Sequence, residues 1–292
     1  MTAEIDRETP KPATMVEGIL DEREMRKARR EKVDRIAKFV LPVLVMALTV
    51  LAWYLVVKIN NIQHYILPGP GLVFETLVKD YKVLFDALQI TLLITFAALG
   101  IAVVGGVGLA VLFAQSKWVE MSFFPYAIIM QVTPVIVVAP LIFIYVSSKI
   151  VGLLICAWIV AFFPILSNTT LGLNSVDHNL RNLFELYGAS RWQTLLYLRL
   201  PASLPYFLGG LRIAGGLALI GAIVAEFVAG TGGVGSGLAF TILEASYRLN
   251  IPLMFAAILL ISATGIAIFA ATTLVSHLLL RKWHESALKR EN

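Results

Sequence analysis

The chain has 292 residues, of which 58% are hydrophobic and only 15% are charged. A soluble domain carries roughly 25% charged residues, so water is not the solvent of most of this surface. The formal net charge of +5 does not indicate nucleic-acid binding, because the basic residues flank apolar segments, and the single cysteine excludes an intramolecular disulfide.

The first 38 residues are rich in charges of both signs and poor in apolar bulk. They are expected to form a solvated basic tail, residues 1–38. The first apolar run begins only at Phe39, and no small-residue cleavage site follows it. This run is therefore expected to remain as a membrane span and not to be removed as a signal peptide.

Six apolar stretches approach the length needed to cross a membrane. A hydrocarbon core of about 30 Å requires about 20 helical residues. We expect an all-α membrane protein, with six transmembrane helices in residues 39–280 and a cytoplasmic tail in residues 281–292. The predicted spans are Phe39–Val57, Ile90–Ala114, Phe123–Val146, Ile150–Leu166, Tyr206–Val228 and Ile251–Leu280.

Lysine and arginine are distributed unequally between the two sets of connections. They concentrate in residues 1–38, in the loop between spans four and five, and in residues 281–292. Cytoplasmic loops carry such an excess of positive charge. Both chain ends are therefore predicted to be cytoplasmic, in agreement with an even number of spans.

The third predicted span contains polar residues and prolines that could line a pathway. Proline removes a helix hydrogen bond, and the bend that follows can expose backbone carbonyls to a cavity. Kinks of this kind also occur without any contact to a solute. The candidate pathway residues here are Gln131, Thr133, Pro134 and Pro140.

The loop between spans four and five has the pattern of an amphipathic helix. Gly188 follows that pattern and can adopt the left-handed conformation that ends a helix. The apolar face is expected either to bind a partner protein or to lie on the membrane. It consists of residues at i, i+3, i+4 and i+7, namely Leu180, Leu183, Phe184 and Tyr187.

A second short helix is predicted directly after this turn. Ser190 and Gln193 have the spacing of a capping box, and Pro201 is expected to end the helix. The product would be a helical hairpin, residues 180–201, that projects from the membrane.

This loop also carries a family resemblance. Gly188 begins the stretch GASRWQ and is followed by Leu198 and by Leu200-Pro201, a pattern that resembles the cytoplasmic signature of inner-membrane permeases of binding-protein-dependent ABC importers. The Glu-Ala-Ala that opens the signature is replaced by Asn182-Leu183-Phe184. The resemblance implies that residues 180–201 contain the coupling helix, which docks on a cytoplasmic ATP-binding cassette subunit. The implied contact residues are Asn182, Leu183, Phe184, Glu185, Tyr187, Gly188, Ala189, Ser190, Leu200 and Pro201.

Other segments resemble the branch of this family that carries nitrate, sulfonates, taurine and bicarbonate. They are Leu67-Pro68-Gly69-Pro70, Pro140-Leu141, Phe163-Pro164 and Gly209-Gly210-Leu211-Arg212. The resemblance implies a permease of the bacterial inner membrane for a small solute, and a sulfonate, nitrate or similar anion is the first expectation. Relatives that carry riboflavin or a pyrimidine vitamin precursor are similar enough to keep those solutes open.

The implied partners are ATP-binding cassette subunits, a periplasmic or lipid-anchored solute-binding protein, a second permease copy or sister chain, and membrane lipid. The sequence has no phosphate-binding GxxxxGK[ST] motif and no catalytic constellation, so ATP is expected to be hydrolysed by another subunit. No enzyme activity, cofactor or metal is expected in this chain.

The fifth predicted span carries small residues at four-residue spacing and one acid. Gly210, Ala214, Ala218 and Ala222 are expected to allow close helix packing. Glu226 continues the series, and an intramembrane carboxylate is by default a functional candidate, here for the translocation pathway. An ion-coupled secondary transporter, the alternative from another class, would be expected to carry several such groups.

A glycine-rich stretch, residues 230–235, matches the dinucleotide-binding fingerprint literally. It follows a membrane span and not a strand, and no acidic residue stands at the required distance after it. We therefore interpret it as a turn at the outer side, from which the chain re-enters the membrane.

Overall fold

The computed structural model describes residues 33, 37–38, 40–230 and 236–281. It divides into two units, Met1–Gln63 and His64–Asn292, which are described separately. Almost all of the two predicted tails, and residues 231–235 of the glycine-rich stretch, lie outside the described residues. The boundaries predicted for the tails remain predictions.

The first unit contains one long apolar helix, Val40–Ile59. Its 20 residues agree with the first predicted span, apart from Phe39, which lies outside the described residues. Asn61 follows with a positive φ of 46°, the left-handed conformation in which helices commonly end.

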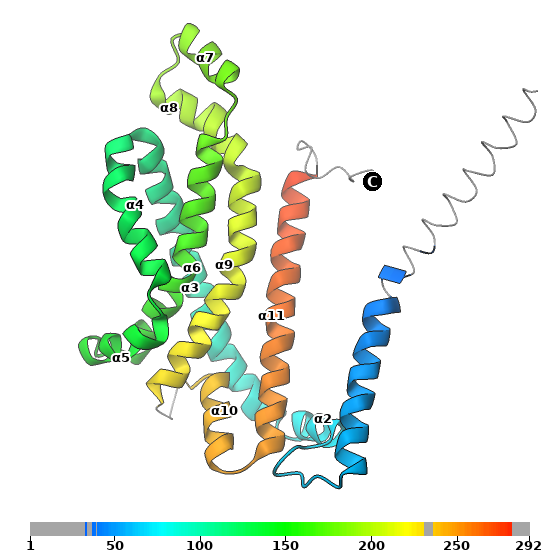
Figure 1. The fold of residues 1–292 in the computed structure, drawn as a ribbon. Coiled ribbons are helices and arrows are strands. Elements are labelled where there is room, and N and C mark those ends of the chain that lie inside the picture. The colour runs from blue at the N-terminus through cyan, green and yellow to red at the C-terminus, as the bar shows by residue number, and fades with distance from the viewer. Residues whose placement is uncertain (1–32, 34–36, 39, 231–235, 282–292) are drawn as a thin grey trace, which may run out of the picture. The chain divides into compact units, whose positions relative to one another are not determined.

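The described part of the second unit is helical throughout, without strands (Figure 1). Four of its helices are long and apolar enough to cross a bilayer, counting α8, η1 and α9 as one continuous helix. The helices are α2 (Pro70–Lys79), α3 (Tyr81–Gln115), α4 (Lys117–Val132), α5 (Val135–Tyr145), α6 (Lys149–Asn174), α7 (His178–Leu186), α8 (Arg191–Thr194), the π-helix η1 (Leu195–Arg199), α9 (Leu200–Ala229), α10 (Leu238–Tyr247) and α11 (Ile251–Leu280).

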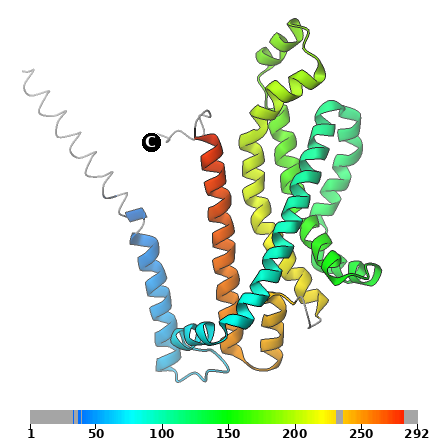
Figure 2. The same ribbon diagram turned by 180° about the vertical axis from the view of Figure 1, so that it is seen from behind.

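The core of this unit is formed by α6, which packs against both α3 and α9 (Figures 1 and 2). Small residues of α9 make the close approach possible. A Cβ atom at Gly210 would lie 2.7 Å from the carbonyl oxygen of Pro164, and one at Gly221 would lie 2.9 Å from the Cα of Ala157. The predicted series Gly210, Ala214, Ala218 and Ala222 is buried, so the prediction of close packing along this stripe is confirmed.

The fourth span is longer than the sequence predicted. Ile150–Leu166 was expected, but α6 has 26 residues and ends only at Asn174. Asn168 near its end is compatible with the helix because it bonds within it, donating from Nδ2 to the carbonyl of Pro164 at 2.8 Å.

The third span is not the continuous helix expected over Phe123–Val146. It consists of α4 and α5, whose axes are bent by 101° relative to each other. Thr133 and Pro134 both have extended backbones at the break, and the Thr133 hydroxyl donates to the carbonyl of Ile129 at 2.7 Å. Pro134 has no N–H with which to continue the helix. Among the described residues there are six candidate spans if this bent pair counts as one.

The connections lie at two opposite ends of the second unit (Figure 1). Helices α7 and α8 lie at one end, as does the end of α11. Helices α2, α5 and α10 lie at the other end. Helix α10 has 10 residues and is too short to span a bilayer alone. It follows the glycine-rich stretch and packs on α11, α9 and α3.

Candidate functional site

Helix α7 is the first arm of the predicted hairpin. Asp177 caps its start, accepting a hydrogen bond from the Asn179 N–H at 2.7 Å. Arg181 and Glu185, one turn apart on the same face, form an ion pair with an Nε–Oε1 distance of 3.3 Å. The helix therefore has local sources of stability, although none of its residues is buried.

A tight turn at Gly188 ends α7. The Gly188 φ of +66° lies in the left-handed region, as the sequence predicted. The Ala189 N–H donates to the carbonyl of Phe184 at 2.9 Å, and the Gly188 N–H donates to that of Glu185 at 3.0 Å. These two bonds form a Schellman motif, which satisfies carbonyls that the helix end would otherwise leave free.

The second arm begins with the predicted capping box. The Gln193 N–H donates to the Ser190 hydroxyl at 3.2 Å, and the Ser190 N–H donates to the Gln193 side chain at 2.7 Å. These two reciprocal hydrogen bonds fix the start of the second arm directly after the turn.

The expectation that this arm ends before Pro201 is wrong. The chain continues through α8 and η1 directly into α9 without leaving helical conformation. The Leu200 N–H bonds to the carbonyl of Leu195, five residues back, which is the spacing of a π-helix. Pro201 is the second residue of α9 and so lies inside this continuous helix, where it donates no backbone hydrogen bond to the preceding turn.

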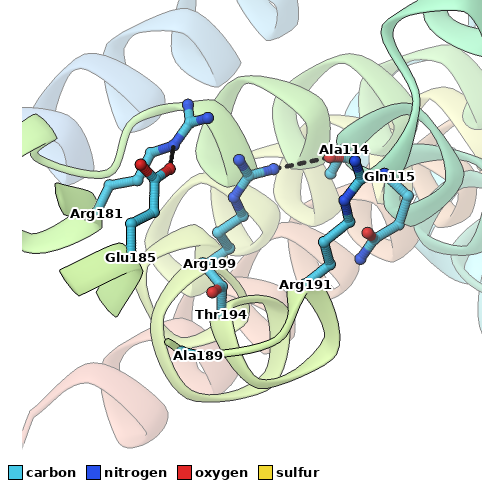
Figure 3. A pocket seen from close by; sticks show the side chains of 8 residues that line it. All are labelled: Ala114, Gln115, Arg181, Glu185, Ala189, Arg191, Thr194 and Arg199. Carbon is cyan, nitrogen blue, oxygen red and sulfur yellow. Dashed lines mark hydrogen bonds and ion pairs between the residues drawn. The ribbon is translucent and has the colours of Figure 1, made fainter. Parts of the chain in front are cut away.

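Two contacts join the hairpin to the membrane helices. Leu195 is buried in a cluster with Phe113 of α3 and Leu173 of α6. Arg199 donates from Nη1 to the carbonyl oxygen of Ala114 at 2.8 Å (Figure 3). Ala114 lies in the last turn of α3, where carbonyls lack helical partners and a cation is favourable.

The outer face of the hairpin is uncovered. Tyr187 is 84% exposed and Leu183 is 44% exposed, whereas Phe184 is half-buried. The structure brings the other predicted coupling residues into the same hairpin. Asn182, Glu185, Gly188 and Ser190 are exposed, Ala189 is half-buried, and Leu200 and Pro201 lie half-buried at the junction with α9.

The predicted pathway residues of span three lie at and beside the break between α4 and α5. Gln131 and Pro134 are exposed, Thr133 is half-buried, and Pro140 is exposed within α5. Helix α5 packs on α6 and α9. The structure therefore separates these residues from the hairpin, which lies at the opposite end of the unit (Figure 1).

Glu226 lies near the end of α9 and is only 2% exposed. Its carboxylate accepts a hydrogen bond from the Thr91 hydroxyl at 2.9 Å and another from the Ala239 N–H at 3.0 Å. The Thr91 oxygen also accepts from the Leu238 N–H at 2.9 Å. Thr91 and Glu226 thus accept hydrogen bonds from two N–H groups at the start of α10, which have no partner within that helix. These bonds join α3, α9 and α10.

Sequence reasoning identified Glu226 but missed its partners. Thr91 stands 135 residues away within an apolar run, and no local pattern marks it. Gly237 is the other part of this site, because a Cβ atom there would collide with the Glu226 carboxylate. In the sequence, the position of Gly237 just after the glycine-rich stretch was the feature that could have indicated this contact.

Apolar helices able to cross a bilayer, with a helical hairpin whose apolar face is uncovered, define a multi-span membrane protein. Comparison with known families makes the class specific. Residues 102–281 match the family described as the binding-protein-dependent transport system inner membrane component. The match covers more than half of the chain, so the chain belongs to this family of ABC transporter permeases.

Several permeases of this family are similar over most of their length. The riboflavin transport system permease protein of Chloroflexus aurantiacus is 33% identical, over 84% of this chain and 90% of its own. The formylaminopyrimidine transport permease protein of Halalkalibacterium halodurans is 32% identical, with coverages of 82% and 94%. The putative aliphatic sulfonates transport permease protein of Bacillus subtilis is 28% identical, with coverages of 89% and 92%.

The fold is also that of a solved transporter. A crystal structure of an amino acid ABC transporter superposes with a TM-score of 0.58, at 19% identity, covering 72% of this chain and 98% of the other. The expected all-α permease fold is therefore confirmed, and the family membership replaces the alternative of an ion-coupled secondary transporter.

Proposed function

We propose that residues 180–201 dock on a cytoplasmic ATP-binding cassette subunit, which hydrolyses ATP and drives transport through this chain. The observation that carries the proposal is the uncovered apolar face of α7, with Leu183 and Tyr187 held outward on a hairpin closed by hydrogen bonds on both sides. An apolar surface of this kind is stabilised when a partner covers it.

The hairpin is joined to the membrane helices in a way suited to transmitting motion. Its second arm continues through η1 into α9, and Arg199 bonds to the end of α3. A displacement of the docked hairpin would therefore act on α9 and α3 together. Closing of the ATPase subunits would in this way change the relative positions of the helices, giving alternating access.

The solute pathway is proposed to run beside the break between α4 and α5. Gln131, Thr133, Pro134 and Pro140 lie there, and prolines free backbone carbonyls for contact with a solute. Glu226 would serve the pathway by fixing α10 at that end, because its carboxylate already bonds to Thr91 and Ala239.

The remaining assembly follows the family. We propose an inner-membrane location with both termini cytoplasmic, a second permease copy or sister chain that completes the pathway, and surrounding lipid. A periplasmic or lipid-anchored binding protein would deliver the solute. This chain would contribute no catalytic group and bind no cofactor of its own.

Two solute classes are supported. A sulfonate, nitrate or similar small anion fits the sequence resemblance and the sulfonate relative at 28% identity. The higher identities to the riboflavin and formylaminopyrimidine permeases favour the second class. Uptake by the whole importer of a radiolabelled alkanesulfonate, compared with riboflavin and a formylaminopyrimidine, decides between them.

The docking proposal is tested with Gly188→Val. A β-branched residue does not tolerate the φ of +66°, and the turn between the two arms should be lost. The strain of about 1–2 kcal/mol should reduce ATPase co-purification about tenfold. Gly71→Val is the control, because Gly71 is helical and a Cβ there meets nothing within 4 Å. Unchanged co-purification of Gly188→Val, with unchanged coupling of ATP hydrolysis to transport, would refute the docking role.

A further inference from the structure

A cavity of about 380 Å³ lies between the hairpin and the end of α3 (Figure 3). It does not include Leu183 or Tyr187 of the uncovered apolar face, although it shares Glu185 and Ala189 with the predicted coupling residues. Its lining is polar and mainly cationic, and comprises Ala114, Gln115, Arg181, Glu185, Ala189, Arg191, Thr194 and Arg199.

The cavity is lined by three guanidinium groups and one carboxylate, so its net charge is positive. Glu185 is the one acid in the lining, and it is paired with Arg181. Arg199 donates one of its N–H groups to Ala114. In the part of the chain that the structure describes, the Arg191 side chain has neither a hydrogen-bond nor an ion-pair partner. The cavity therefore offers at least one free guanidinium beside two others.

Arg199 is partly buried and interacts with charges of both signs here, because Arg181 repels it and Glu185 attracts it. The two other arginines of the lining leave the space with a net positive charge. An anion between guanidinium groups removes such repulsion and adds charge-assisted hydrogen bonds, which arginine forms especially well with phosphate. The lining thus favours a bound phosphate-type anion.

Exposed aromatic residues indicate that the cavity lies at the level of the membrane surface. Trp118 is 81% exposed and follows Lys117 in the first turn of α4, just after the lining residue Gln115. Trp192 and Tyr197 are also exposed, and they stand one residue after Arg191 and two residues before Arg199 in the sequence. Tryptophan and tyrosine are enriched at lipid headgroups, where basic pockets bind anionic lipids.

We propose that this cavity binds the phosphate group of an anionic phospholipid from the cytoplasmic leaflet. Arg191 and Arg199 would contact the phosphate oxygens, while Trp118 and Trp192 lie in the headgroup layer around it. The inference rests on the proposed cytoplasmic position of the hairpin. A lipid held there would support the contact between the hairpin and α3.

The test measures lipid binding to the purified full-length chain in detergent by native mass spectrometry. The probes are short-chain phosphatidylglycerol, short-chain phosphatidylcholine and inorganic phosphate. Wild-type protein should bind phosphatidylglycerol in preference to both other probes. Arg191→Gln should weaken this binding about fivefold, which corresponds to about 1 kcal/mol for one basic group near a membrane surface.

Arg248→Gln is the matched control, because Arg248 is exposed and ion-paired with Glu244 at the opposite end of the unit. An equal loss of phosphatidylglycerol binding in this control would show that the effect comes from the overall charge of the protein, and it would overturn the proposal. Inorganic phosphate that binds as tightly as phosphatidylglycerol would overturn the lipid assignment. Unchanged lipid binding in Arg191→Gln, with reduced ATPase co-purification, would instead assign the cavity to an acidic residue of the ATPase. Lipid binding needs no ATPase, so its failure is distinct from failure of the docking proposal.

Discussion

The Glu226 carboxylate illustrates how one residue can hold three helices. A buried carboxylate is costly to remove from water if it lacks hydrogen-bond partners. Here the hydrogen bonds from Thr91 and from the start of α10 replace those from water. The partial positive charge of a helix N-terminus adds to this stabilisation.

Replacing Glu226 separates its hydrogen-bonding role from its charge. Glu226→Leu removes both acceptors and leaves the buried Ala239 N–H unpaired, at a cost of about 1–3 kcal/mol. Glu226→Gln keeps one carbonyl oxygen for this N–H and should lose much less. Thermal unfolding in detergent measures both, with Glu75→Leu on the exposed side of α2 as control. A Leu variant as stable as the wild type would contradict the role of Glu226 in fixing α10.

Individual residues were predictable where their partners were close in sequence. The left-handed Gly188 and the capping box of Ser190 and Gln193 followed from spacing alone, and both are present. The bonds of Glu226 to Thr91 and of Arg199 to Ala114 span 135 and 85 residues. Contacts at such distances depend on how helices pack, and no local pattern encodes them.

At the scale of helices, the close packing of α6 against α9 depends on glycine residues, which have no side chain at the contact. The Cβ that Gly221 lacks would meet the Ala157 backbone, which cannot move aside as a flexible side chain could. Without a hydrophobic driving force between helices in lipid, such close packing is a principal source of association.

Gly221→Ala should therefore separate α6 from α9 locally and lower the stability by about 1–3 kcal/mol, the usual cost of overpacking. Gly216→Ala is the matched control in the same helix, since a Cβ at Gly216 meets nothing within 4 Å. Denaturant unfolding in mixed micelles compares the two. Equal stability of both variants would show that the contact between these helices is not close in the membrane.

Helix boundaries were harder to predict than helix positions. Each apolar run contains a helix, but α3 begins at Tyr81 and α6 ends at Asn174, beyond the apolar runs themselves. Pro134 suggested a bend without giving its size, because the 101° angle depends on the packing of α5 against α6 and α9. The π-helix η1 left no sequence signal that we recognised.

For the molecule as a whole, the family match and the fold agree with the predicted membrane permease, and the predicted helical hairpin is present. The hairpin of α7 and α8 and the helix α5 lie toward opposite ends of the second unit (Figure 1). The continuous helical connection from η1 into α9 was not anticipated, and the proposed coupling depends on it.

The central claim is that an ATPase subunit covers the hairpin, and site-specific photocrosslinking tests it most directly. A photoreactive phenylalanine at Tyr187, which is 84% exposed, should crosslink to the ATPase in membranes of cells that contain the whole importer. Tyr247 is the matched control, because this tyrosine also ends a short helix, is 80% exposed, and lies at the opposite end of the unit. We predict an ATPase adduct from position 187 and none from position 247. An adduct from position 247, or none from position 187 in an actively transporting complex, would contradict the account.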